Sequence, residues 1–139
     1  MRIFLDANIL FSAAKSNGAV RQLLGLLRDA GHTLCADDYV VAEARRNLEL
    51  KAPDSGTALE DQLAHVDVAP FEASGLPPGL AARLPEKDWP VLAAAMRLRC
   101  ETLVTGDRTH FGALYGKTVS GVSIHSPRSL AEAALTKKR

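Results

Sequence analysis

Short apolar runs alternate with helical patterns along this chain, and that alternation limits the folds open to it. Strand-like runs occupy residues 3–5, 32–36, 102–105 and 122–124, and a weaker run at 66–68 is typical of an edge strand. Between them, apolar residues recur at the three- and four-residue spacing of a helix face. Strands that alternate with helices favour a parallel sheet covered on both faces. We therefore expect an α/β fold with a central, mostly parallel sheet.

Capping residues indicate where the expected helices begin and end. Gly31 is the expected end of the helix that follows the first strand, because glycine commonly closes a helix. Asp37 or Asp38 can cap the next helix, and Asp88 precedes a helix that we expect to run to residue 99. The proline-rich passage at 70–85 indicates a loop around one helical turn instead of a linker between domains.

Length and charge fit one ordinary globular domain. A chain of 139 residues can build one real core but hardly two, so we expect a single domain over residues 1–139. The net charge of +1 does not indicate that the protein as a whole binds nucleic acid, although one part of its surface can still be basic. A final helix capped by Ser126 is expected to lead into a charged end at 137–139.

The cysteines and the absence of long apolar stretches predict a cytoplasmic protein. Cys35 and Cys100 adjoin apolar segments, which favours buried free thiols over a disulfide. The chain begins with a strand-like run instead of a basic segment followed by an apolar one, and no stretch approaches a membrane span. We therefore expect no contact with a membrane.

Acidic residues lie at the expected carboxyl ends of the strands, where α/β proteins commonly have their active sites. Asp6 and Asp107 directly follow strands, while Glu43 and Asp88 lie at or near helix starts. Carboxylates gathered beyond the carboxyl ends of strands repel one another, and a divalent cation relieves that repulsion. Taken singly, each has a structural explanation. Asp6 and Asp88 are common helix caps, Glu43 suits a solvated helix face, and Asp107 suits a turn.

Oxygen ligands of this kind favour a hard cation, Mg²⁺ or Mn²⁺. No ligand spacing joins the cysteines to the four histidines, which argues against zinc. A bound Mg²⁺ or Mn²⁺ lowers the pKa of its water and stabilises charge on a phosphodiester. Asn8 can orient Asp6 or a water, or simply cap a helix. Thr105 can donate to a carboxylate, or be an ordinary strand residue.

Basic residues close to the acids in sequence are candidates for binding RNA phosphates, although each also suits a solvated surface. They are Arg45, Arg46, Lys87, Arg108 and Lys117. The aromatic residues Trp89, Phe111 and Tyr115 are expected in the core instead of on a stacking surface, because the chain contains few aromatic residues.

Segments that follow one another along the chain resemble the PIN domain. They are IFLDANIL at residues 3–10, Glu43 on the helix after the second strand, Asp88 before a helix with AAA at 93–95, and LVTGDRTHF at 103–111. The resemblance covers essentially the whole chain. It implies a three-layer α/β/α sandwich and a ribonuclease site that depends on Mg²⁺ or Mn²⁺.

The same resemblance implies roles for individual residues. Four acids would be both catalytic residues and metal ligands: Asp6, Glu43, Asp88 and Asp107. Asn8 and Thr105 would support them. A stand-alone PIN domain of this length is most similar to VapC-type toxins of toxin–antitoxin pairs, which implies an RNA substrate, a cognate antitoxin and a homodimer. The passage at 70–87 carries no family signature, and Asn8 stands where many members have other polar residues.

Two other functions fit the same residues. A non-catalytic RNA- or protein-binding module on this fold is one alternative, which the presence of all four acids disfavours. A phosphohydrolase that forms an aspartyl-phosphate on Asp6 is the other. That chemistry normally needs a second acid two positions later, where this chain has Asn8.

Overall fold

A six-stranded sheet lies at the centre of the computed structural model, which describes residues 1–73 and 75–135. Its strands are β1 (Arg2–Leu5), β2 (Thr33–Asp37), β3 (Asp67–Ala69), β4 (Thr102–Val104), β5 (Thr118–Val119) and β6 (Val122–His125). They lie in the order β3-β2-β1-β4-β6-β5. The pairing of β5 with β6 is antiparallel, and the other pairings of this sheet are parallel.

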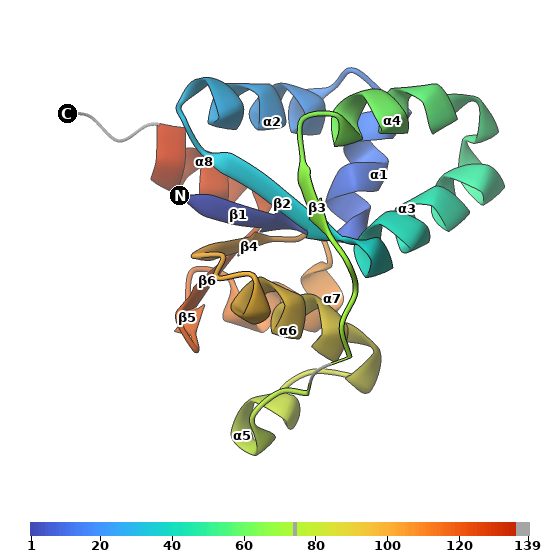
Figure 1. Cartoon of the computed structure of the whole chain (residues 1–139). Coiled ribbons are helices and arrows are strands. Elements are labelled where there is room, and N and C mark those ends of the chain that lie inside the picture. Colours follow the sequence, from blue (N-terminus) through green and yellow to red (C-terminus); the bar gives the residue numbers. More distant parts are fainter. Residues whose placement is uncertain (74, 136–139) are drawn as a thin grey trace.

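Helices cover both faces of the sheet, as Figure 1 shows. The α-helices are α1 (Ala7–Lys15), α2 (Ala19–Asp29), α3 (Asp38–Lys51), α4 (Gly56–Leu63), α5 (Pro78–Ala81), α6 (Trp89–Arg97), α7 (Arg108–Phe111) and α8 (Pro127–Leu135). Short 3₁₀ helices are η1 (Pro53–Ser55), η2 (Glu86–Asp88) and η3 (Gly112–Leu114). The helices α1 to α4 pack together on one face, and α6 and α7 lie on the other. This is the expected α/β/α sandwich with a mostly parallel sheet.

The central strands are buried on both faces, which explains their continuous apolar sequence. Ile3, Phe4 and Leu5 of β1 are completely buried, as parallel strands between two helical layers require. The β1–β4 register pairs Leu5 with Val104. The residues after these two strands therefore emerge side by side at the same edge of the sheet, and the amide of Asp6 donates to the carbonyl of Val104.

The helix after β1 begins earlier than the sequence patterns indicate. Asp6 is the N-cap of α1, so Asn8 lies inside that helix instead of capping it. The helix α2 ends as expected, because Gly31 follows its C-cap with a φ of +92°, in the left-handed region that glycine tolerates. The strand β5 was not expected from the sequence. The charged end at 137–139 lies outside the described residues.

The proline-rich passage is a loop with one helical turn, as expected, and two side chains of α6 hold it. Trp89 Nε1 donates to the carbonyls of Ala81 and Leu84, each at 3.0 Å. The Arg97 guanidinium donates to the carbonyls of Pro70 and Glu72, each at 3.2 Å. Figure 1 shows α5 standing away from the sheet at the far end of this loop.

Most of the remaining expectations about the core are confirmed. Cys35 and Cys100 are both buried and free. Phe111 is fully buried, while Trp89 and Tyr115 pack partly buried against the core. Among the described helices, none is both long and apolar enough to cross a membrane.

Candidate functional site

A polar cavity of about 210 Å³ lies beyond the carboxyl ends of β1 and β4. Residues from both strand ends and from the starts of α3 and α6 line it: Asp6, Asn8, Tyr39, Glu43, Lys87, Asp88, Val91 and Asp107. The four acids singled out in the sequence therefore share one cavity. Their convergence follows from the topology, because β1 and β4 are neighbours and end at the same level.

Asp6 is a nearly buried carboxylate that is costly to ionise. Its Oδ1 accepts from the Ala7 amide at 2.7 Å, and its Oδ2 accepts from the Thr105 hydroxyl at 2.7 Å. Burial raises the pKa of Asp6 from 3.8 to about 6, against the lowering effect of these two hydrogen bonds. This value already includes a smaller raising effect of the negative charges of Glu43 and Asp88. A cation in the cavity would offset both the burial and the repulsion.

Asn8 and Thr105 tie the two strand ends together. Asn8 Nδ2 lies 3.4 Å from Asp6 Oδ2 and 3.4 Å from Thr105 Oγ1, and its Oδ1 accepts from the Gly106 amide at 2.7 Å. The Thr105 hydroxyl also accepts from the Asp107 amide at 3.1 Å. Gly106 permits this close approach, because a Cβ there would lie 3.3 Å from Asn8 Oδ1. Both residues are thus placed to orient Asp6.

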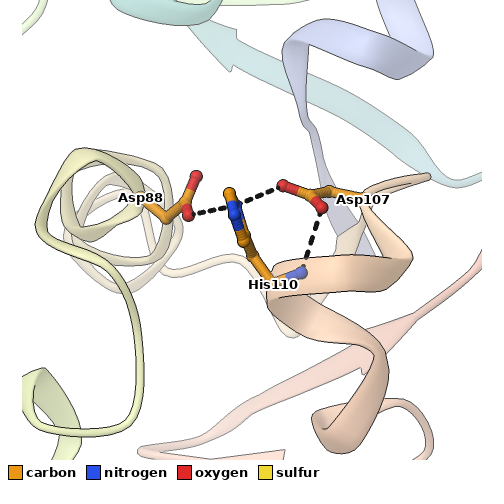
Figure 2. A group of neighbouring side chains, drawn as sticks. All are labelled: Asp88, Asp107 and His110. Carbon is orange, nitrogen blue, oxygen red and sulfur yellow. Dashed lines mark hydrogen bonds and ion pairs between the residues drawn. The ribbon is translucent and has the colours of Figure 1, made fainter.

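Asp88 and Asp107 face each other across a histidine that the sequence reasoning did not single out. Figure 2 shows the His110 ring between the two carboxylates. Its Nδ1 lies 2.7 Å from Asp88 Oδ2 and 2.8 Å from Asp107 Oδ2. Asp107 Oδ1 accepts from the His110 amide at 3.0 Å and so caps α7. The only sequence signal for His110 is its position three residues after Asp107, at the start of a short helix.

The pKa of Asp88 is raised above its usual value of 3.8, chiefly by burial. The negative charge of Asp107 raises it further, whereas His110 and Lys87 lower it. Asp88 makes no side-chain cap for α6, so the helix-cap explanation does not account for its place. Asp6 and Asp107 do cap helices, and they line the cavity as well.

Glu43 lines the cavity from α3 without a hydrogen bond or ion pair to another described residue. Its negative charge raises the pKa of Asp6 and of Tyr39. Burial is the larger cause of the raised pKa of Tyr39, whose hydroxyl donates to the Lys87 carbonyl at 3.3 Å. The Glu43 carboxylate therefore faces the cavity with its oxygens available to water or a cation.

The basic residues fall into three groups. Arg45 forms an exposed ion pair with Glu60 at 2.8 Å and lines a separate hollow of about 120 Å³ beside α4. Lys87 lines the acidic cavity itself. Arg46 and Arg108 are exposed, as is Lys117.

The acids of the cavity, together with the neighbouring His110, fit a divalent cation. Ligand atoms of Asp88, Asp107 and His110 lie within 4.8 Å of one another. Asp88 Oδ2 and His110 Nδ1 are both buried, and neither has a hydrogen-bond partner of suitable geometry among the described residues. Buried polar atoms without such a partner are costly, and coordination to a cation satisfies them. The oxygen-rich donor set suits Mg²⁺ or Mn²⁺.

Comparisons with known proteins agree with the resemblance seen in the sequence. Residues 2–109 match the family model described as PIN domain. The structure is similar to a chain in the crystal structure of VapBC2 from Rickettsia felis bound to a DNA fragment from its promoter, with a TM-score of 0.69 and 19% sequence identity. The similarity covers 91% of this chain and 98% of that one, and at this identity it concerns the fold. No curated protein matches the sequence.

Proposed function

This chain belongs to the PIN domain family, and we propose that it is an endoribonuclease that depends on Mg²⁺ or Mn²⁺. The observation that carries the proposal is the convergence of Asp6, Glu43, Asp88 and Asp107 on one cavity. Carboxylates that repel one another, one with its pKa raised to about 6, form a site that is stabilised when a cation enters.

In this proposal Asp6, Asp88 and Asp107 hold the ion, and Asn8 and Thr105 fix the orientation of Asp6. A bound divalent ion supplies an activated water and stabilises the charge that develops on the phosphodiester. Glu43, which has no partner among the described residues, orients water or adds a further oxygen ligand.

Exposed cations near the cavity hold the RNA backbone in this proposal. Lys87 lines the cavity. Arg46 and Arg108 are exposed, and neither forms an ion pair in the described part of the chain. Phosphate contacts of this kind position RNA without reading its sequence. Arg45 is the weakest of the candidates, since Glu60 already neutralises its charge.

We further propose that the chain is the toxin of a toxin–antitoxin pair and that it forms a homodimer in the cytoplasm. The support is its similarity in fold to a chain of the VapBC2 structure over nearly the whole length of both. Light scattering after gel filtration tests the dimer. Co-purification with the product of an adjacent small gene tests the partner, and a protein that is monomeric and purifies alone from its native operon would contradict both.

The nuclease proposal is tested by cleavage of a labelled structured RNA. Cleavage is expected with Mn²⁺ or Mg²⁺, and it should disappear with EDTA or in the Asp6→Asn variant. Asp61→Asn is the matched control, because Asp61 is exposed on α4 and does not line the cavity. Cleavage that persists both with EDTA and in the Asp6→Asn variant would contradict the proposal. RNA binding without cleavage and without Mn²⁺ binding would favour a non-catalytic module instead.

A further inference from the structure

His110 adds an imidazole to a site that the proposed function describes with acids alone. We propose that His110 Nδ1 is a direct ligand of the divalent ion, together with Asp88 and Asp107, and that this nitrogen makes the site prefer Mn²⁺ to Mg²⁺. The inference rests on the proposed function, since it concerns the ion of that same site. It differs from that function in naming a nitrogen ligand and a metal preference.

The distances between the three side chains already match those between neighbouring ligands. His110 Nδ1 lies 2.7 Å from Asp88 Oδ2 and 2.8 Å from Asp107 Oδ2. Neighbouring ligands of an octahedral ion with bonds of about 2.1 Å lie roughly 3 Å apart. Small adjustments of the side chains would therefore admit an ion at the end of the cavity that Asp88 and Asp107 line.

Hydrogen bonding explains the arrangement only in part. The Nδ1–H of an imidazole can align well with one of the two carboxylates but not with both. Both Nδ1 and Asp88 Oδ2 are buried, and neither has a hydrogen-bond partner of suitable geometry in the described part of the chain. Two such atoms at 2.7 Å are better explained as members of one coordination shell.

The backbone holds His110 in this place. Its amide donates to Asp107 Oδ1 at 3.0 Å, and the next residue, Phe111, is fully buried in the core. Figure 2 shows that the ring leaves α7 in the direction of Asp88, which lies just before α6. The imidazole is thus directed toward the acids by a capped helix start and by an anchored neighbour.

A nitrogen ligand changes which metals the site favours. Mg²⁺ takes oxygen ligands and keeps several waters. Divalent first-row transition metals, Mn²⁺ among them, bind the nitrogen of imidazole more strongly than Mg²⁺ does. With His110 as a ligand, Mn²⁺ should bind more tightly than Mg²⁺. Replacing His110 with asparagine should reduce Mn²⁺ affinity by about tenfold or more, since even outer-shell partners of a metal site contribute that much. Mg²⁺ affinity should change less.

The test is electron spin-echo envelope modulation on the Mn²⁺-loaded protein, which detects a nitrogen bonded to the metal independently of activity. The wild type should show coupling to one nitrogen, and the signal should change when histidine is labelled with ¹⁵N. His110→Asn should lose the coupling, and His65→Asn should retain it. His65 is a matched control because it is exposed and lies after α4, away from the cavity lining.

The labelled wild type decides the question even when His110→Asn does not fold. Bound Mn²⁺ without histidine coupling would overturn the inference and leave the proposed function standing. Failure of the wild type to bind Mn²⁺ at all would overturn both. Equal affinities for Mn²⁺ and Mg²⁺ in calorimetry would contradict the metal preference.

Discussion

Replacing Asp6 with asparagine should stabilise the metal-free protein, although the same change should abolish RNA cleavage. The pKa of Asp6 is raised from 3.8 to about 6 in the folded protein, mainly by burial. A folded pKa above the unfolded value means that ionisation of Asp6 favours unfolding. The resulting loss of stability sets in as the pH rises from 3.8 to about 6, and it is complete at pH 7.

The size of the effect follows from the shift. A rise of about two units in the pKa of Asp6 means that its ionisation lowers the free energy of unfolding by about 3 kcal/mol at pH 7. Asparagine cannot ionise, and its oxygen can still accept from the Ala7 amide. Its NH₂ group must face Thr105 Oγ1, which reverses that hydrogen bond at a cost of about 1 kcal/mol. The expected net gain is therefore about 1–2 kcal/mol.

Urea denaturation in EDTA at pH 7 and pH 4 measures this difference. Asp6→Asn should unfold at a higher urea concentration than wild type at pH 7, and this difference should vanish or slightly reverse at pH 4. With Mn²⁺ at a hundred times its Kd, the wild type should gain about 2.7 kcal/mol and the variant much less, which reverses the order. Asp61→Asn should stay within about 0.5 kcal/mol of wild type throughout. An Asp6→Asn variant less stable than wild type at pH 7 in EDTA would show that ionisation of Asp6 does not destabilise the fold.

Three further predictions concern Arg97, the pH dependence of metal binding and Gly106. Arg97→Ala should lower stability by about 2 kcal/mol in urea denaturation, because the fully buried Asp37 then loses the guanidinium that lies 3.7 Å from its Oδ2. Mn²⁺ affinity in calorimetry should fall as the pH drops below about 6, because protonated Asp6 is a poor ligand. Gly106→Ala should slow RNA cleavage several-fold while leaving the far-ultraviolet circular dichroism unchanged, since its Cβ would lie 3.3 Å from Asn8 Oδ1 and displace the amide beside Asp6.

The strands that are buried on both faces of the sheet could be predicted from the sequence. The strands β1, β2 and β4 lie between two helical layers, so their sequences are continuously apolar and easy to recognise. The helix α1 was harder, because Asp6 serves both as its cap and as a cavity residue. The two-residue strand β5 is too short to carry a periodic pattern, and it forms only by pairing with β6.

The site was predictable to the extent that it follows strand ends. Asp6 and Asp107 each come directly after a buried strand, and neighbouring parallel strands bring such residues together. Glu43 lines the cavity because α3 follows β2 and begins at the same edge of the sheet, although its local sequence also suits a solvated helix face. The contact of His110 with Asp88 joins α7 to η2, which are far apart in the sequence, so no local pattern indicates it.

Anomalous diffraction from a crystal soaked in Mn²⁺ locates the ion without any assay of activity. We expect an anomalous peak in the acidic cavity, within bonding distance of Asp88 and Asp107 and on the side that Asp6 lines. A peak elsewhere on the protein, or a cavity that stays without one at saturating Mn²⁺ and neutral pH, would contradict this expectation.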